Sequence, residues 1–215
     1  MKSTTDKPEK TAYHHGDLRT ALVLHAVKLI HARGDLNFSL RDLAMKIGVS
    51  HVAVYRHFAD KAALLNAVAV HGFGLLAQAM RDAGEGWSHE PEQQLARQGA
   101  AYVNMAVRYP GHFAAMFASQ TAKSGQSPEL QAVAEVAYQL LAQTVARRLQ
   151  SAHLPSANVH AEALRCWALV HGLACLQLSG NLAACLGHDP MNTSDEALQA
   201  FVMGFLLPAG VVVPP

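Results

Sequence analysis

Hydroxyl groups, imidazoles and cations gather in one part of the chain, between residues 39 and 61. Such side chains donate hydrogen bonds to anionic oxygens, and an imidazole can also donate to or accept from the edge of a nucleobase. The segment therefore predicts a surface that binds a polyanion. The residues that supply this chemistry are Ser39, Arg41, Ser50, His51 and Lys61.

Residues 38–58 predict two short helices, over about 40–47 and 51–57, joined by a tight turn. Ser39 is the expected N-cap of the first helix, and Asp42 can return a hydrogen bond to the N–H of that cap. Ser50 would cap the second helix. The contact points of a helix-turn-helix would be Ala44, Gly48 and Val54: a small residue, a turn glycine and a branched apolar residue.

The front of the second helix, Ser50 to Ala53, would meet base edges, because this helix enters the major groove of DNA in such units. His51 is the expected base reader, since its imidazole can donate to guanine N7 or accept from an amino group. Val52 and its alanine neighbour would touch thymine methyl groups.

Three further side chains flank that helix on neighbouring elements. Ser39 and Arg41 begin the first helix and are expected to reach the DNA backbone; for Arg41 a plain surface charge is the alternative. Lys61 lies in the first turn of a helix that Asp60 caps, where the positive end of the helix dipole disfavours a cation. A phosphate there would be held by Lys61 and free backbone N–H groups, and a solvated lysine is the alternative.

The amino-acid composition limits the classes of protein to which this chain can belong. The chain has 215 residues, 51% of them hydrophobic, enough for one large or two modest domains. Ala and Leu dominate, so an all-α fold is expected. Three cysteines, an odd number, indicate a reducing cytoplasm better than a disulfide framework. We see no signal-peptide core and no apolar run of about 18–20 residues, and therefore expect a cytoplasmic protein without a membrane span.

The net charge of +1 conceals an asymmetry. Residues 1–62 carry ten Lys and Arg against six Asp and Glu, whereas residues 63–215 carry seven against ten. A basic head on a slightly acidic body favours contact between the head and phosphates.

Helical periodicity continues along the rest of the chain. We expect an N-terminal helix-turn-helix DNA-binding domain of three helices over 13–62 and a helical ligand-binding and dimerisation domain over 63–215, with a soft boundary inside a shared long helix. The helices expected around the helix-turn-helix are Asp17–Arg33, a long one from Asp60 to the glycines at 84 and 86, Pro91–Arg108, Gly111–Ser119, 128–149, Asn158–Leu178 and 194–207.

Two segments carry a resemblance to a known family. Tyr13–Arg19, the helix-turn-helix and Tyr55–Lys61 followed by Leu64-Leu65 together resemble the tetracycline-repressor (TetR/AcrR) family of bacterial regulators over about residues 13–70. Further on, Trp167–Gly172 looks like the Trp, His-Gly (WHG-type) signature of one branch of the family's C-terminal domains.

The resemblance implies a ligand-responsive transcriptional regulator, most readily a repressor. It implies a homodimer on a near-palindromic double-stranded DNA operator, a four-helix dimer interface and release by a small-molecule inducer whose entry shifts the long helix. It also implies that Tyr55 and His57 donate to DNA phosphates, with packing between helices as the alternative for Tyr55.

Met and aromatic residues at helical spacing in the second part are of the types that line ligand pockets, and ordinary core is their alternative role. Trp167 and His171 are four residues apart and therefore share a helix face. His171 would either orient an inducer or satisfy a buried backbone group. The candidate pocket residues are Tyr102, Met105, Phe113, Met116, Phe117, Tyr138, Trp167 and His171.

Other functions find less support in the sequence. His171 and Cys175 are spaced to share a metal, but no third ligand, CxxC or HExxH follows, so we expect no metal and no cofactor; a redox role for Cys175 lacks a partner. The absence of a GxSxG elbow, a phosphate loop or paired carboxylates argues against an enzyme such as a helical hydrolase. A ligand-binding adaptor that has lost DNA binding is opposed by the intact Ser50–Lys61 segment.

Overall fold

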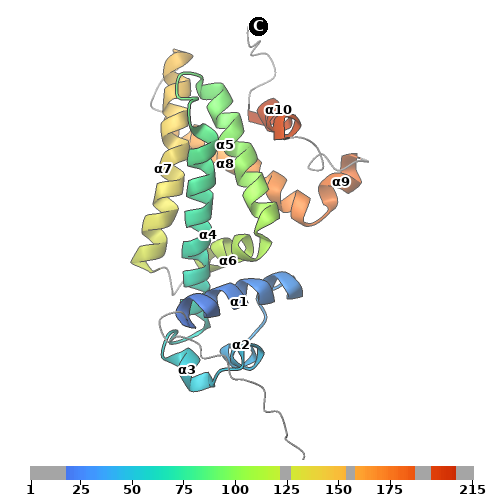
Figure 1. Ribbon diagram of the computed structural model, residues 1–215. Helices are drawn as coiled ribbons and strands as arrows, with labels where there is room; N and C mark the ends of the chain where they lie inside the picture. The colour runs from blue at the N-terminus through green and yellow to red at the C-terminus, as the bar shows by residue number, and fades with distance from the viewer. Residues whose placement is uncertain (1–17, 122–126, 154–157, 187–194, 207–215) are drawn as a thin grey trace, which may run out of the picture.

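The structure, a computed structural model, describes residues 18–121, 127–153, 158–186 and 195–206. Within these ranges the chain forms ten α-helices and no strand, which confirms the predicted all-α class (Figure 1). Tyr13 to Asp17 and the expected cap Ser194 lie outside the described residues. The helices are α1 Leu18–Arg33, α2 Leu40–Ile47, α3 His51–Tyr55, α4 Lys61–Gly84, α5 Pro91–Arg108, α6 Pro110–Thr121, α7 Pro128–Ser151, α8 Val159–Leu178, α9 Asn181–Leu186 and α10 Asp195–Leu206.

The caps predicted for the helix-turn-helix are present. Ser39 Oγ accepts from the Asp42 N–H at 3.1 Å, and Asp42 Oδ2 accepts from the Ser39 N–H at 2.9 Å. Hydrogen bonding of the Asp42 carboxylate, first with the Ser39 backbone and then with its side chain, lowers the pKa of Asp42, because it favours the charged form. Gly48 ends α2 with φ +77°, a left-handed conformation that glycine adopts without strain. The turn geometry thus follows from local sequence.

The predicted helix bounds agree with the structure to within about two residues, and two differences have a clear physical reason. The second helix of the motif ends at Tyr55 rather than at residue 57, because Val54 O accepts from both the His57 and the Phe58 N–H at 3.0 Å and closes a tight turn. Past Gly180, between the last two predicted helices, the additional helix α9 forms and buries Leu182. The burial of Leu182 depends on contacts with other parts of the fold, so the local sequence pattern did not reveal this helix.

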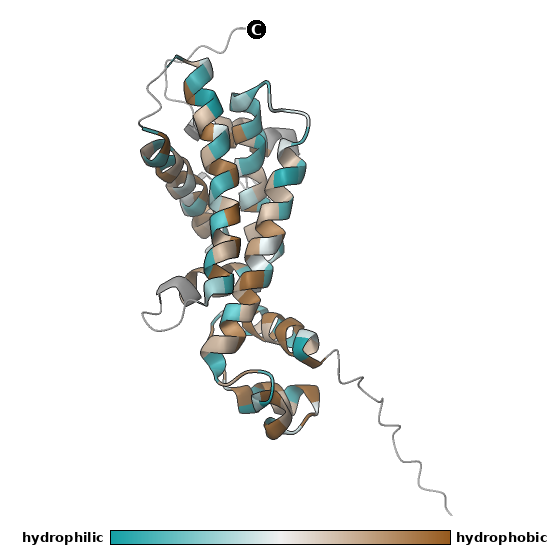
Figure 2. Cartoon of the chain, turned by 90° about the vertical axis from the view of Figure 1, so that its left-hand side faces the viewer, coloured by the Kyte–Doolittle hydropathy of each residue, from teal (hydrophilic) through white to brown (hydrophobic). Residues whose placement is uncertain are grey.

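Two hydrophobic cores share the long helix α4. Its first turns place Leu64 and Val68 in the N-terminal core with α1, α2 and α3, and its later turns place Phe73 and Leu76 in the C-terminal core. Figure 2 shows hydrophobic and hydrophilic residues alternating along the long helices, as expected for helices with one buried side. The domain boundary after residue 62 stays a prediction, and the N-terminal core continues past it into α4.

Among the described residues, only α4 is long and apolar enough to cross a membrane by length and composition. This test averages hydropathy over a window, whereas the sequence prediction counted uninterrupted apolar residues, a run that Asn66, His71 and Gln78 break. In the fold, α4 packs against α1, α5, α6 and α7. A helix at the centre of an all-helical protein needs the same composition, so burial accounts for it.

The head is also attached to the body where α1 crosses the start of α6. A Cβ atom added to Gly111 would lie 2.7 Å from the backbone oxygen of Val27. Backbone cannot move aside as a side-chain tip can, so this crossing needs glycine.

Gly111→Ala is therefore expected to lower the free energy of unfolding by about 1–3 kcal/mol, the usual range for overpacking a tight contact. Thermal and denaturant unfolding of the purified protein would measure it. The matched control is Gly74→Ala on α4, where an added Cβ meets nothing within 4 Å; it should leave stability unchanged or raise it by about 0.5–1 kcal/mol. Equal effects of the two substitutions would contradict the packing account.

Candidate DNA-binding surface and ligand cavity

The predicted DNA-contacting residues lie on or directly beside α2 and α3 and at the start of α4, at the lower end of the molecule in Figure 1. Most are exposed, and the rest are half-buried, so all are open to solvent to some degree. The exposed ones are Ser39, Arg41, Ser50, His51, Val52 and Tyr55, and the half-buried ones are Ala53, His57 and Lys61.

The short helix α3 has one buried and one open side. Val54 is fully buried in the N-terminal core, whereas Val52 and Tyr55 are each 53% exposed. Ser50 Oγ caps the helix by accepting from the Ala53 N–H at 3.2 Å. Large apolar groups on a capped, rigid helix are suited to contact with a partner.

Lys61 has a partner that the sequence did not predict. Its Nζ lies 4.9 Å from the centre of the Phe38 ring, a cation–π contact that draws the side chain toward the start of α2. At the same helix end, Asp60 Oδ1 accepts from the Ala63 N–H at 2.8 Å. A phosphate at this position would accept hydrogen bonds from the Lys61 ammonium and from those backbone N–H groups in the first turn of α4 that are not bonded to Asp60.

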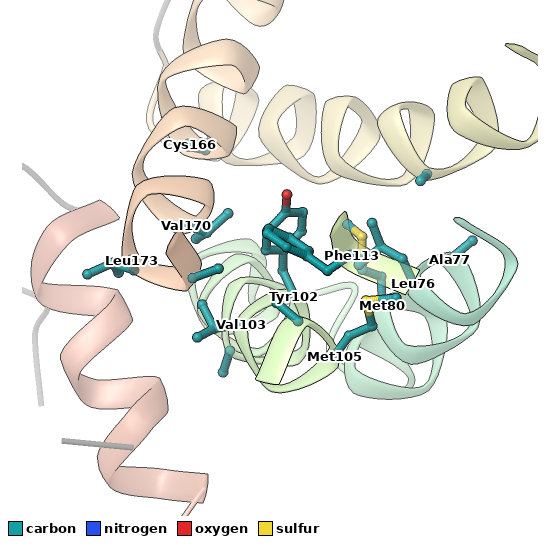
Figure 3. Packing of buried hydrophobic residues seen from close by; sticks show 14 of the residues in the cluster. Leu76, Ala77, Met80, Tyr102, Val103, Met105, Phe113, Cys166, Val170 and Leu173 are labelled. Carbon is teal, nitrogen blue, oxygen red and sulfur yellow. The ribbon is translucent and has the colours of Figure 1, made fainter. Parts of the chain in front are cut away.

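A cavity of about 360 Å³ lies in the body among α4, α5, α7 and α8, with one residue from α6. Most of its wall is apolar or aromatic. In Figure 3 the Tyr102 side chain stands between Val170 of α8 and Leu76 and Met80 of α4. The lining residues are Phe73, Leu76, Met80, Leu95, Gln98, Gly99, Tyr102, Phe117, Gln131, Ala134, Glu135, Ala137, Tyr138, Leu141, Cys166, Trp167 and Val170.

The structure divides the eight predicted pocket residues equally. Four of them line the cavity: Tyr102, Phe117, Tyr138 and Trp167. The other four do not. Met105, Phe113 and Met116 belong to the packed core, and the ring of His171 stacks on that of Phe113 with centroids 5.3 Å apart. These four are Met105, Phe113, Met116 and His171.

Sequence reasoning missed the wall contributed by α4 and, apart from Tyr138, the wall contributed by α7. On α4, Phe73, Leu76 and Met80 follow each other at steps of three and four, the spacing of one helix face. That signal was present, but it is shared by every buried helix face. Only the packing of α4 against its neighbours shows which stripe borders a cavity.

A chain of hydrogen bonds leads from the cavity to the outer side of α8. Trp167 Nε1 donates to the Tyr102 hydroxyl at 3.3 Å, and the same hydroxyl shares a hydrogen bond of 2.8 Å with His171 Nδ1, whose direction the His171 tautomer sets. His171 Nε2 lies 3.5 Å from Cys175 Sγ. Burial raises the pKa of Tyr102 and lowers the pKa of His171, so both are neutral near pH 7. His171 thus pairs with a side-chain hydroxyl rather than with a buried backbone group.

His171 and Cys175 do come together, as their spacing predicted. The described residues nevertheless contain no group of three His, Cys, Asp or Glu side chains that could hold a metal. Burial raises the pKa of the Cys175 thiol, which disfavours the reactive thiolate.

A histidine pair joins α4 to α6 near the attachment of the head. His71 Nδ1 and His112 Nε2 lie 2.9 Å apart, and the ring of His112 also packs edge-on against Tyr109. His112 is only 4% exposed. Burial, and next the neighbouring His71, lower its pKa to about 4.

We expect stability to depend on pH through His112. Its ordinary pKa is about 6.5, so between pH 6.5 and 4 the unfolded chain binds the proton more tightly than the folded chain. The stabilisation is complete above pH 6.5 and decreases as pH falls toward 4, by a loss of order 2 kcal/mol. Chemical unfolding at a series of pH values would measure it. His112→Gln should flatten this slope, whereas His31→Gln, on the exposed side of α1, should keep it; equal slopes in all three proteins would refute the assignment.

Two family models match the chain. That of the "Bacterial regulatory proteins, tetR family" matches residues 22–68, and that of the "Tetracyclin repressor-like, C-terminal domain" matches residues 95–201. The first covers the helix-turn-helix, and the second spans most of the cavity wall and the segment Trp167–Gly172. No curated protein matches the chain.

Solved structures share the fold over nearly the whole length. A protein of unknown function from Rhodococcus sp. RHA1 is 30% identical, with a TM-score of 0.74 over 92% of this chain and 97% of that one. The TetR family transcriptional regulator PfmR from Thermus thermophilus is 21% identical, with a TM-score of 0.63 over 86% and 96%. A TetR-family regulator from Bordetella parapertussis 12822 is 16% identical, with a TM-score of 0.66 over 93% and 99%. With both family models matched and the helix-turn-helix in place, the chain belongs to the TetR family of transcriptional regulators.

Proposed function

We propose that this protein is a cytoplasmic repressor that binds a near-palindromic operator as a homodimer and is released when a small-molecule inducer enters its cavity. The membership in a family of DNA-binding regulators supports the general activity. The observation that carries the proposal is the open side of α3, where Val52 and Tyr55 are each 53% exposed on a helix whose opposite side is buried.

The proposed contacts fall into two groups. Base edges are read by the front of α3, with His51 as the hydrogen-bonding residue and Ser50, Val52 and Ala53 beside it. Phosphates are held by residues at the start of α2, at the end of α3 and just after it, and at the start of α4, which together fix the register of α3 in the groove. The phosphate-binding group consists of Ser39, Arg41, Tyr55, His57 and Lys61.

The proposed dimer uses the outer side of α8. Leu164 is 57% exposed, and Ala168 and Cys175 are also exposed at helical steps from it. A two-fold axis would pair this face with the same face of a second copy, together with α10, and bury its apolar groups. The two heads could then occupy adjacent major grooves about 34 Å apart.

Release is proposed to work through α4. One end of this helix carries Lys61 and packs in the N-terminal core, and the other end supplies Phe73, Leu76 and Met80 to the cavity wall. A ligand that binds better when α4 is displaced would shift the population toward a head spacing that does not fit DNA. No metal, cofactor or catalytic step is part of this proposal, and an ester-turnover assay would test for catalysis.

Lys61→Ala tests the phosphate contact. The operator would first be selected from genomic fragments of the source organism. The variant should bind every sequence more weakly by a similar factor, and the slope of log K against log salt should shrink by about one phosphate contact per subunit of the dimer. Arg81→Ala removes one positive charge at the opposite end of α4 and should change neither quantity. An altered sequence preference in Lys61→Ala would contradict the assignment.

His51→Ala tests the base contact. The variant should lose about 1–3 kcal/mol of discrimination at one base pair of each half-site and little affinity for sequences already altered there. Competition binding with single-base operator variants would measure this. His31→Ala, on an exposed part of α1, is the control. If His51→Ala weakens all sequences equally, His51 does not read a base.

A further inference from the structure

We propose that the cavity takes an uncharged, mostly apolar ligand that donates a hydrogen bond to α5. The proposal deepens the proposed function, on which it rests, by naming the chemical class of the inducer. Three features of the described residues carry it: two hydrogen-bond acceptors on α5, the aromatic wall around them, and the absence of a buried charge in that wall.

The first acceptor is Gln98. Its residue is only 3% exposed, and it is the one polar residue among the lining residues that is buried to this extent. Its Nε2 donates to Met80 O at 3.5 Å, whereas its Oε1 is buried with no hydrogen-bond partner among the described residues. An unpaired buried acceptor costs free energy, and a donor on a bound molecule would remove that cost.

The second acceptor is Tyr102, one helical turn further along α5 and on the same side. A tyrosine hydroxyl donates one hydrogen bond and can accept two. Trp167 donates one bond to this hydroxyl, and we assign the proton of the Tyr102–His171 bond to Tyr102, which places the His171 proton on Nε2 beside Cys175 Sγ. One lone pair is left for a ligand, and the hydroxyl cannot readily offer a proton because that proton is already committed.

The wall around these acceptors is neutral. None of the described lining residues is Lys, Arg or His. Cys166 is buried, which raises the pKa of its thiol to about 11 and keeps it uncharged. Glu135, the carboxylate of the lining, is exposed and accepts a hydrogen bond from Gln139. An anion inside would lack a counter-charge, and so would a cation placed at the buried acceptors.

Aromatic side chains make up much of the remaining wall. Phe73 and Phe117 pack edge-on with centroids 6.1 Å apart, and Phe117 lies 6.4 Å from Trp167. Rings of this kind favour flat apolar molecules through offset-stacked and edge contacts. A two-ring aromatic carrying a single polar head is therefore a suitable probe.

The test compares four biphenyls that differ only in the group at position 4: hydroxymethyl, methoxymethyl, carboxylate and methylammonium. Each would be titrated into the full chain at pH 7 and followed by tryptophan fluorescence, since Trp167 lines the cavity. We expect the hydroxymethyl compound to bind about tenfold tighter than its methyl ether, and at least about tenfold tighter than either charged compound.

Matched variants locate the acceptor. Tyr102→Phe and Gln98→Met should each reduce the preference for hydroxymethyl over methoxymethyl to about threefold or less and leave binding of the ether nearly unchanged. Tyr138→Phe is the control, because Tyr138 also lines the cavity but its hydroxyl pairs with His160 at 2.7 Å; it should keep the full preference.

The proposal is overturned if a charged probe binds best, if the ether equals the alcohol, if neither α5 variant changes their ratio, or if none of the probes binds. Operator binding of the same preparation without any probe is measured alongside. Intact DNA binding with any of these outcomes rejects the ligand class alone, whereas loss of DNA binding rejects the proposed function.

Discussion

The rest of the structure depends on one constraint, which is that a single helix belongs to two cores. Leu64 and Val68 fix one end of α4 in the head, and Phe73 and Leu76 fix its other end in the body. Packed interiors resist small changes in shape, because each void or overlap costs contacts. The position of α4 in the body and the position of α3 beside the start of α4 therefore depend on each other, because both cores contain residues of α4.

A second helix, α6, also connects the head to the body, so the head does not depend on α4 alone for its attachment. Ala115 of α6 is buried in the N-terminal core, and Phe117, two residues on, lines the cavity. At its start, α6 meets α1 at Gly111, and the His71–His112 pair ties it to α4. The head is thus held on two helices, α4 and α6, that both border the cavity.

What could be predicted from the sequence was what depends on neighbours along the chain. The capping box of Ser39 and Asp42 and the left-handed Gly48 are local, so their residue types alone specified them. The cavity is different. Met105 and Leu76 are both apolar residues on helical faces, and only the packing of four helices puts Leu76 on the wall and Met105 in the core. The contact of Lys61 with Phe38 likewise joins elements across a turn.

The hydrogen-bond chain behind the cavity explains why its polar wall has a definite direction. If Tyr102 stood alone, its hydroxyl could donate to a ligand or accept from one. With the His171 proton on Nε2, Nδ1 accepts the Tyr102 proton, and Trp167, which has only a donor, takes one of the two acceptor sites. Since the pKa of Tyr102 is raised and that of His171 is lowered, neither group changes charge near neutral pH. In this tautomer the side of α5 that borders the cavity is an acceptor, and the buried Gln98 Oε1 one turn away has the same character.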